Sequence, residues 1–369
     1  MIYLDNGATS FHKPPQVIRA VVRAMQTCAN PGRGGYEAAM NAARRVYECR
    51  ETASELFDCN PEQVVLTTSC THGLNIAIRS LIKPGMPVAV SGFEHNAVIR
   101  PLHALGAKIL PGGRKLFDWE DTLEGFQRCL EQGAQAAVIT QVSNVFGYVL
   151  PVEQMAAMCK RAGIPLILDA AQSAGSLKIS LKDLGAAFIA MPGHKGLLGP
   201  QGTGLLLCAQ DCEPLLFGGT GSLSASREMP AELPERLEPG TLNVPGIAGL
   251  TEGMRYVKNT GVEEIFRREH RQRLLCSREL QKMGMRVFSG EHQASALSFL
   301  PDMDCEEAAE LLARQGIAVQ AGLHCAPMAH ESAGTLESGT VRISFGYDAS
   351  FRQTEAFLRA ASKLPGFRK

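Results

Sequence analysis

The chain has no excess charge of either sign and no apolar run long enough to span a membrane. Lysine plus arginine and aspartate plus glutamate each number 37 in 369 residues, so the formal net charge is zero. This balance provides no general attraction to nucleic acid or to an anionic membrane. No stretch approaches the ~20 apolar residues of a spanning helix, and the N-terminus lacks a secretory signal pattern. We expect a cytoplasmic protein whose partners are small molecules or other proteins.

Paired cysteines and nucleotide-binding motifs are also lacking. The eleven cysteines are scattered singly, without a C-x-x-C pair or a regular His and Cys spacing. This argues against a disulfide framework and against zinc, so no metal site is expected. The chain lacks G-x-x-x-x-G-K-[ST], and no G-x-G-x-x-G follows its first strand, which disfavours nucleotide binding. With 45% hydrophobic residues, the chain is long enough for two domains.

Short apolar runs alternate with helical patterns over the first two thirds of the chain. Such alternation is typical of β-α-β units and predicts an α/β fold with a mainly parallel sheet. We expect strands at 63–67, 88–91, 108–110, 136–140, 165–169, 186–191 and 205–208. Helices are expected at 14–28, 36–57, 73–82, 97–105, 120–131 and 152–162.

The last third has a different pattern. Residues 214–245 are rich in Gly, Ser, Pro and charge, which predicts a long functional loop. Beyond it we expect helices at 247–259, 262–283, 305–315 and 350–364, with strands at 285–287, 296–299, 318–320 and 341–345. We therefore predict a large domain over residues 13–255 and a smaller α+β domain over 256–369, with residues 1–12 packed against the smaller one.

Lys195 lies among glycines in a turn between two of the apolar runs. Burying an unpaired lysine is costly, so a lysine in such a setting needs a chemical reason. One reason is a Schiff base, because desolvation lowers the pKa of a lysine and leaves a nucleophilic amine. The alternative is a surface lysine on a tight hairpin.

Asp169 closes the most apolar strand in the chain, 26 residues before the lysine. Ligands of α/β sheets collect at the carboxyl ends of strands. A buried carboxylate becomes favourable opposite a protonated pyridine nitrogen, as in pyridoxal phosphate. The alternative is an aspartate that caps the following helix.

Polar residues also follow three other strands. The segment Thr67-Thr-Ser-Cys-Thr-His-Gly73 offers hydroxyls and amides at a helix start, which favours a phosphate site; simple capping by Thr71 is the alternative. His95 could stack on a flat ring and move protons, although a lone histidine at such a position is more often structural. The amide of Asn144 could hold a cofactor oxygen or a substrate carboxylate.

These motifs occur together in a recognisable order. They are Tyr3-Leu-Asp-Asn-x-Ala-Thr9, Glu94-His95, Ser143-Asn144, Asp169-x-x-Gln172, Gly193-His-Lys195 and Pro239-Gly-Thr241. Over nearly its whole length the chain resembles the pyridoxal-phosphate cysteine desulfurases, a branch of the class V aminotransferase-like enzymes. The resemblance implies an aspartate-aminotransferase-like fold and pyridoxal 5′-phosphate as cofactor.

The resemblance also implies a role for each matching residue. Lys195 would hold the cofactor as a Schiff base, Asp169 would pair with its ring nitrogen and Gln172 would bond its ring oxygen. His95 would stack on the ring and assist proton transfers. The phosphate would be bound by Thr71, by His194 and, from a neighbouring subunit, by Thr241, which implies a homodimer with shared active sites.

Cys325 has the most favourable context for a sulfur acceptor. It lies beside His324 in a Gly-rich turn after a strand, where a thiolate could reach a bound ligand. Cys70, in the proposed phosphate segment, ranks second. The resemblance extends to a short His-Cys-Ala loop and places Arg342 where family members grip the substrate carboxylate, a role suited to the guanidinium fork.

The expected reaction converts L-cysteine to L-alanine, with sulfur carried as a persulfide on Cys325 and passed to an acceptor protein. Iron–sulfur cluster assembly is the commonest association of the family. Alternatives are selenocysteine lyase activity with L-selenocysteine, transamination or epimerisation, and a non-catalytic scaffold that binds a sulfur-transfer partner. The chain departs from the usual family pattern at three places. Pro192 stands where the family usually has a serine, Gln320 stands where many members of the short-loop branch have an arginine, and the histidine that those members have near position 36 is missing around Tyr36.

Overall fold

The apolar runs between residues 63 and 208 form one seven-stranded sheet in the computed structural model, which describes residues 1–32 and 34–364. The strand order is β2-β8-β7-β6-β5-β3-β4. The strands are β2 (Val64–Thr67), β3 (Pro87–Ser91), β4 (Lys108–Gly112), β5 (Ala136–Thr140), β6 (Leu166–Asp169), β7 (Phe188–Pro192) and β8 (Gly204–Cys208). The five strands from β3 to β7 are mutually parallel, whereas β8 is antiparallel to both of its neighbours. The prediction of a mainly parallel α/β sheet is confirmed.

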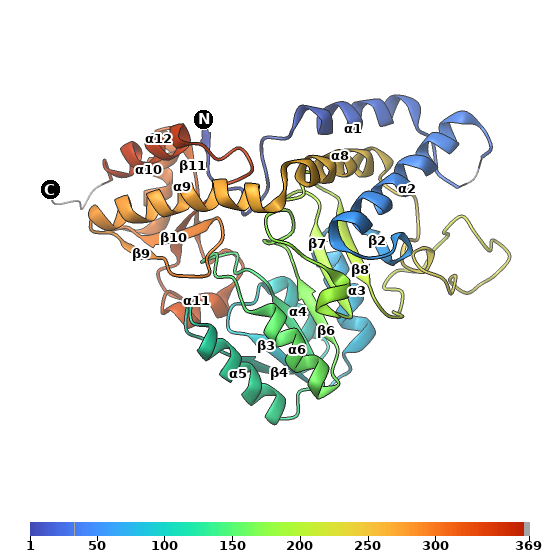
Figure 1. Ribbon diagram of the computed structural model, residues 1–369, viewed down its shortest axis with the longest axis horizontal. Coiled ribbons are helices and arrows are strands. Elements are labelled where there is room, and N and C mark those ends of the chain that lie inside the picture. Colours follow the sequence, from blue (N-terminus) through green and yellow to red (C-terminus); the bar gives the residue numbers. More distant parts are fainter. Residues whose placement is uncertain (33, 365–369) are drawn as a thin grey trace.

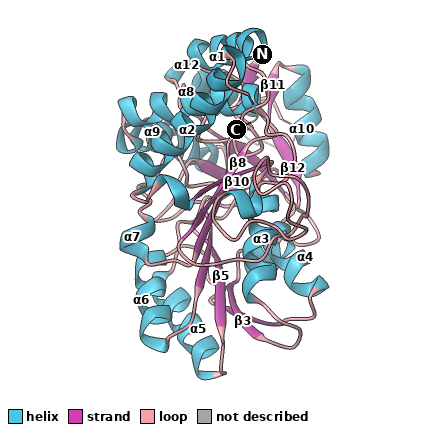
Figure 2. Ribbon diagram, turned by 90° about the vertical axis from the view of Figure 1, so that its right-hand side faces the viewer, coloured by secondary structure: helices cyan, strands magenta, loops and turns pink. Residues whose placement is uncertain are grey.

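Helices cover both faces of this sheet, which explains why its strands are apolar throughout. Figure 2 shows α5 (Trp119–Glu131), α6 (Val152–Ala162) and α7 (Leu181–Leu184) on one side of the strands and α3 (Cys70–Leu81) and α4 (Asn96–Ala104) on the other. Successive strand residues supply the two faces in turn: Ile167 packs in one core cluster, while Leu166 and Leu168 pack in the other. Helices α1 (Pro15–Thr27), α2 (Glu37–Phe57) and α8 (Val244–Thr260) complete this part of the chain.

A second sheet of four antiparallel strands forms the other part of the molecule, with the order β12-β13-β10-β9. Its strands are β9 (Arg286–Phe288), β10 (Ala296–Leu300), β12 (Gln320–Gly322) and β13 (Thr340–Ser344). It has its own core together with α9 (Val262–Lys282), α10 (Cys305–Arg314) and α12 (Phe351–Ala361). The N-terminal β1 (Ile2–Tyr3) pairs with β11 (Ile317–Ala318), and Figure 1 shows the N-terminus beside β11.

These separate cores support the domain division at residues 255 and 256, which we retain as a proposal. Leu4 packs in the core of the second sheet, where the sequence places residues 1–12. The proposed boundary falls inside α8, so this helix continues from one part into the other. The last residues of the smaller predicted domain, 365–369, lie outside the described residues.

Several element boundaries differ from the sequence prediction. Helix α3 begins at Cys70 instead of residue 73, because the Ser69 hydroxyl accepts a hydrogen bond from the His72 amide at 3.1 Å; Thr71 is therefore not the cap. Helix α8 begins at Val244, capped by Asn243, and tolerates Pro245 in its first turn. The prediction missed α7 and α11 (Pro327–Ala333), two helices too short to show an apolar periodicity.

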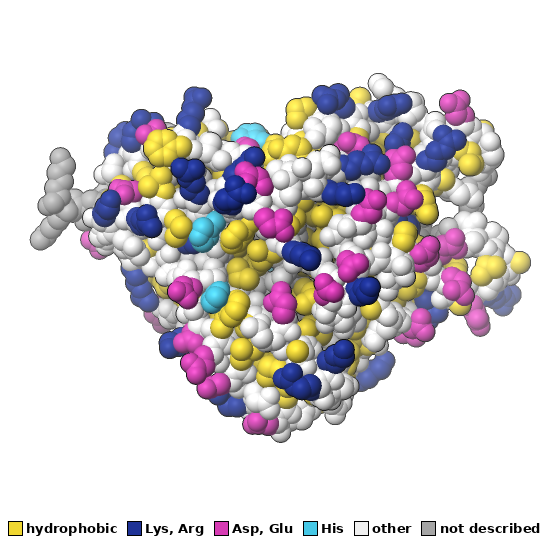
Figure 3. Space-filling model, viewed as in Figure 1, with side chains coloured by type: hydrophobic (Ala, Val, Ile, Leu, Met, Phe, Trp, Pro, Cys, Tyr) yellow, Lys and Arg dark blue, Asp and Glu magenta, His cyan; other side chains and the backbone are white. Residues whose placement is uncertain are grey.

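The segment between β8 and α8 agrees with the predicted long loop. Residues 209–243 contain one 3-10 turn, Glu235–Leu237, and no α-helix or strand. Figure 1 shows part of this loop extending away from the large sheet. Figure 3 shows acidic and basic side chains interspersed over the face it displays, as the zero net charge leads one to expect.

Candidate active site

A cavity of about 100 Å³ lies where parallel strands of the large sheet end. Its lining includes seven of the residues singled out in the sequence: Thr71, His95, Asn144, Asp169, Gln172, His194 and Lys195. Cys70 and Pro192 line it as well. Cys325, Arg342 and Thr241 do not. The carboxyl edge of the sheet therefore brings together residues that are up to 126 positions apart in the chain, from Ser69 to Lys195.

Lys195 is partly buried and lines this cavity, so the alternative of a surface hairpin lysine is wrong. Burial lowers the pKa of its amine, while the negative charge of Asp169 acts in the opposite direction. The turn after β7 has no room for a side chain at residue 196, because a Cβ at Gly196 would lie 2.3 Å from the Ala174 carbonyl oxygen. The glycine therefore allows the lysine turn to pack directly on the segment that follows Asp169.

Asp169 is buried and has one carboxylate oxygen already occupied. Its Oδ1 accepts a hydrogen bond from the Ala171 amide at 2.8 Å and one from the Cys70 thiol at 3.4 Å. Burial, followed by the charge of Asp169, raises the pKa of Cys70 well above its usual value. Cys70 is therefore a neutral donor that orients the carboxylate, and Oδ2 remains for a ligand.

His95 serves both as a helix cap and as part of the cavity lining. Its Nδ1 accepts a hydrogen bond from the Ala97 amide at 3.0 Å, so in the neutral ring the proton resides on Nε2. Burial lowers the pKa of this imidazole, opposed by the charge of Asp169. The structural and the functional interpretation of His95 are thus compatible.

Two other predicted residues, Gln172 and His194, are held by hydrogen bonds to the N-terminal segment. The Gln172 amide donates to the Gly7 carbonyl at 3.0 Å. His194 Nδ1 is 3.0 Å from the Thr9 hydroxyl, and burial, with the charges of Lys195 and Lys13, lowers the pKa of His194 to about 4. His194 is therefore neutral at pH 7 and can act on a phosphate as a hydrogen-bond donor only.

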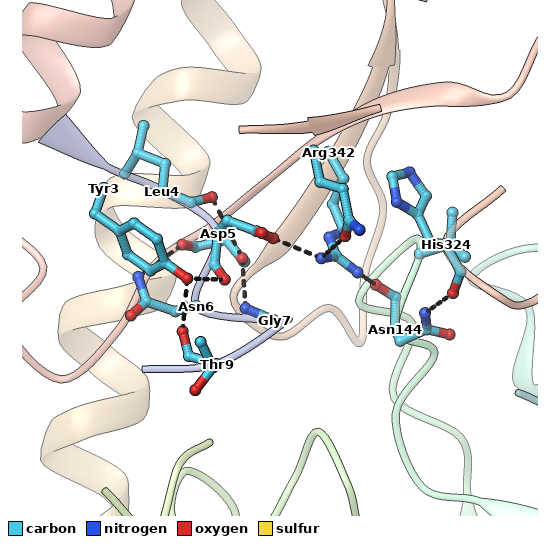
Figure 4. A network of polar contacts seen from close by, with 12 residues as sticks. Tyr3, Leu4, Asp5, Asn6, Gly7, Thr9, Asn144, His324 and Arg342 are labelled. Carbon is cyan, nitrogen blue, oxygen red and sulfur yellow. Dashed lines mark hydrogen bonds and ion pairs between the residues drawn. The ribbon is translucent and has the colours of Figure 1, made fainter. Parts of the chain in front are cut away.

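Arg342 on β13 is buried in a polar network outside the cavity lining (Figure 4). Its Nη2 donates to Asp5 Oδ1 at 2.7 Å and to Gln320 Oε1 at 2.6 Å, and its Nη1 donates to the Asn144 carbonyl at 2.9 Å. Nε is buried without a partner among the described residues. The guanidinium group is thus oriented by protein groups on its two Nη atoms.

Cys325 differs from all the other cysteines in its surroundings. It alone is exposed; the other ten, all within the described residues, are buried or partly buried. His324 and Cys325 have φ values of 48° and 57°, two successive non-glycine residues in the left-handed region, each at a cost of about 1 kcal/mol or more. Exposure and a strained turn distinguish this thiol from Cys70.

Thr241 lies in a different place from the other predicted phosphate ligands. It lines a separate cavity of about 550 Å³, beside the buried ion pair between Arg50 and Glu238. Within one chain, Thr241 and Lys195 therefore belong to different cavities. Any contribution of Thr241 to a phosphate site would have to be made to a second copy.

Comparison with known proteins agrees with this arrangement. A family model described as aminotransferase class V matches residues 2–357. The chain belongs to the class-V aminotransferase family. The chain is 30% identical to a probable cysteine desulfurase of Methanothermobacter thermautotrophicus, and the match covers 94% of the chain and 90% of the relative. It is 28% identical to another of Pyrococcus abyssi, covering 99% and 94%.

A solved structure extends the likeness to three dimensions. The apo cysteine desulfurase of Thermococcus onnurineus superimposes with a TM-score of 0.88 and 29% identity, and the match covers 98% of the present chain and 94% of that chain. The family uses pyridoxal 5′-phosphate. The lining suits this cofactor: an amine of lowered pKa, a carboxylate with a free oxygen, and Asn144 Oδ1, which is buried without a partner among the described residues.

Sequence reasoning missed the many hydrogen bonds between the N-terminal segment and the turn that carries Lys195. The His194 carbonyl accepts hydrogen bonds from the Ser10 amide at 3.0 Å, the Ser10 hydroxyl at 2.9 Å, the Thr9 hydroxyl at 3.2 Å and Lys13 Nζ at 3.1 Å. Burial lowers the pKa of Lys13 to about 8. A polar cluster between the first strand and the first helix was the available signal.

No helix within residues 1–32 and 34–364 combines the length and apolar character required to cross a bilayer. The same residues contain no group of three or more His, Cys, Asp or Glu side chains arranged to hold a metal ion.

Proposed function

We propose that this protein is a cysteine desulfurase that converts L-cysteine to L-alanine and carries the sulfur as a persulfide on Cys325. The observation that carries the proposal is the exposed thiol beside a cofactor cavity: the Cys325 carbonyl accepts a hydrogen bond from the Asn96 amide at 2.8 Å, next to His95. Relatives named as probable cysteine desulfurases over the full chain length support it.

The residues of the cavity would hold pyridoxal phosphate in a defined orientation. Lys195 would bind it covalently, Asp169 Oδ2 would pair with its ring nitrogen, and Gln172 and Asn144 would face its ring oxygen. His194 and Thr71 would donate hydrogen bonds to its phosphate, where Pro192 offers no donor. When bound, the cofactor supplies an electron sink that makes the Cα–H bond of the substrate acidic.

The chain's own residues would bind the substrate and move its protons. Arg342 would bind the carboxylate through its unpartnered Nε–H, held in place by Asp5 and Gln320. Lys195 Nζ, with its lowered pKa, would accept the Cα proton near neutral pH. His95 Nε2–H faces the same cavity and would assist the later proton transfers.

The sulfur transfer balances without an added oxidant. The Cys325 thiolate attacks the substrate sulfur, a sulfur–sulfur bond forms, and the carbon–sulfur bond breaks with its electron pair passing to the carbon, which is then protonated. L-cysteine and the enzyme thiol thus give L-alanine and an enzyme persulfide, whose terminal sulfur passes to an acceptor protein. Transamination and epimerisation need no exposed thiol, so Cys325 favours desulfuration over them.

We also propose a cytoplasmic homodimer with shared active sites, in which Thr241 binds the phosphate in the partner's cavity. The apolar side chains of Ile18, Val22 and Met25 are 57%, 48% and 70% exposed along one stripe of α1, a pattern that marks an interaction surface. Supply of sulfur for iron–sulfur cluster assembly would fit a persulfide on an exposed loop.

Product analysis tests the proposed reaction. The protein loaded with pyridoxal phosphate should form equal amounts of alanine and transferable sulfur from L-cysteine, and mass spectrometry should locate the persulfide at Cys325. L-selenocysteine should be measured in parallel with Cys325→Ala, since loss of activity on cysteine alone would reveal a lyase activity. Pyruvate or racemised amino acid in place of alanine would overturn the proposal.

A further inference from the structure

The loop that carries Cys325 is attached to the cavity by two hydrogen bonds at successive carbonyl groups. The Asn144 side-chain amide donates to the His324 carbonyl at 2.7 Å, and the Asn96 backbone amide donates to the Cys325 carbonyl at 2.8 Å. Figure 4 shows Asn144 between His324 and Arg342. Both donors come from the large sheet region, whereas the loop belongs to the small one.

The conformation of the loop requires such attachment. His324 and Cys325 both have positive φ values, and neither is a glycine that would adopt this backbone freely. Strained residues of this kind persist only where the surroundings hold them in place. Within the loop, the Ala326 amide donates a hydrogen bond to the Leu323 carbonyl at 2.9 Å. The carbonyls of the two strained residues, His324 and Cys325, instead accept hydrogen bonds from groups outside the loop.

The same two donors belong to residues that adjoin the cofactor and substrate groups. Asn144 lines the cavity, and its carbonyl accepts the Arg342 Nη1 hydrogen bond. Asn96 directly follows His95 and opens α4. The carboxylate anchor, the cavity wall and the thiol loop are therefore fixed to one another through residues 96 and 144.

We propose that the Asn96 backbone amide and the Asn144 side chain are positioning groups that hold Cys325 in the strained conformation needed for attack at the cavity. Neither group takes part in bond making or breaking. The inference deepens the proposed function, on which it rests only in treating Cys325 as the nucleophile.

A matched pair of variants at residue 96 isolates the backbone hydrogen bond. Asn96→Pro removes the amide, and proline is well tolerated because residue 96 is the first of the helix and His95 has φ −80° and ψ 155°. Asn96→Ala keeps the amide and serves as the reference for any loss of the side chain. The two proteins differ in the donor to Cys325 while the helix start is preserved.

Hydrogen exchange and thiol alkylation report on the loop in the cofactor-loaded enzyme. Relative to Asn96→Ala, Asn96→Pro should exchange the amides of residues 323–326 about tenfold faster, as expected for one lost hydrogen bond. Cys325 should also be alkylated by iodoacetamide several times faster. With L-cysteine, kcat should fall about tenfold and KM should change less than about twofold, because the ground-state contacts remain.

Asn144→Asp provides the second arm and decides the question if the proline variant does not fold. It has the same shape, but its carboxylate cannot donate to the His324 carbonyl, so loop exchange should again accelerate. Unchanged exchange and alkylation in the folded variants, or accelerated exchange with an unchanged kcat, would overturn the inference. If wild-type protein makes no alanine or persulfide, the proposed function fails while exchange and alkylation still decide the positioning role.

Discussion

The two reactive side chains of this molecule occupy turns that are built in opposite ways. Lys195 follows a buried strand of the large sheet, is surrounded by glycines and has a pKa lowered by burial. Cys325 follows a short strand of the small sheet, is exposed and, together with His324, adopts the left-handed conformation although neither residue is glycine. Burial changes the pKa of the lysine, whereas the backbone conformation of its loop fixes the position of the thiol.

This difference follows from what each group must do. A lysine that binds a cofactor and accepts a proton has to lose its own proton readily, and burial at the end of a sheet favours the neutral amine by lowering its pKa. A thiol that receives sulfur and hands it to another protein has to remain accessible, so burial cannot prepare it. Hydrogen bonds to the loop backbone can fix its position without covering the sulfur.

The largest expected effect comes from removing the buried amine of Lys195. Lys195→Ala deletes both the covalent attachment and the base, so alanine formation from L-cysteine should fall by about 10³-fold or more. The visible absorption of the lysine-bound cofactor should disappear, which a spectrum of the purified protein checks directly. Lys13→Gln serves as a comparison, because Lys13 bonds the His194 carbonyl and does not line the cavity; equal losses in both variants would contradict the assignment.

The next prediction compares the two thiols. Cys325→Ala should abolish persulfide formation, whereas Cys70→Ala should keep it and lose rate about tenfold through a less well oriented Asp169. Deleting the buried Cys70 sulfur should also cost about 1 kcal/mol of stability. Persulfide mapping by mass spectrometry and urea unfolding measure the two effects. A persulfide on Cys70 in the wild type or in Cys325→Ala would reverse the ranking.

Arg342 tests whether the network between the two sheets anchors the substrate. Arg342→Lys keeps one charge but cannot bond Asp5, Gln320 and Asn144 together while presenting Nε–H to a carboxylate. KM for L-cysteine should rise about tenfold, with a smaller change in kcat. Steady-state kinetics over a range of cysteine concentrations measure KM and kcat separately. A change confined to kcat would argue against Arg342 as the carboxylate anchor.

How much of the site can be predicted from the sequence depends on how far apart along the chain the contacting residues lie. The strands ending at Thr140 and Asp169 and the glycines around Lys195 are local patterns, so the sequence alone predicts the sheet. Seven of the proposed site residues line one cavity at its edge. The bond from Arg342 to Asp5 joins residues 337 positions apart, and that from Asn144 to His324 joins residues 180 apart. No periodicity encodes such pairs. Residues 327–333 were not predicted as a helix because seven residues are too few to show an amphipathic pattern.

The smallest expected effect is the contribution of His324, next to Cys325, to the pH dependence of the unfolding free energy. Burial, with the charge of Arg342, lowers the pKa of His324 to about 3, so folding favours its neutral form. Below a pH of about 6.5 the unfolded chain binds a proton that the folded chain excludes until about pH 3, and stability should therefore fall with pH over this window. At pH 5 the loss attributable to this residue is at most about 2 kcal/mol.

The variant His324→Gln separates this contribution from those of other buried groups. Burial raises the pKa of Glu94 and of Glu269 to about 8, so these carboxyls act in the opposite sense, gaining stability as pH falls from 8 toward 4.5. Because those groups are common to both proteins, the difference in unfolding free energy between wild type and variant isolates the imidazole. That difference, measured by urea unfolding at pH 7 and at pH 5, should shift by about 1 to 2 kcal/mol in favour of the variant. A constant difference would mean that the loop keeps its position without a neutral imidazole, leaving the two carbonyl hydrogen bonds as the main restraint on Cys325.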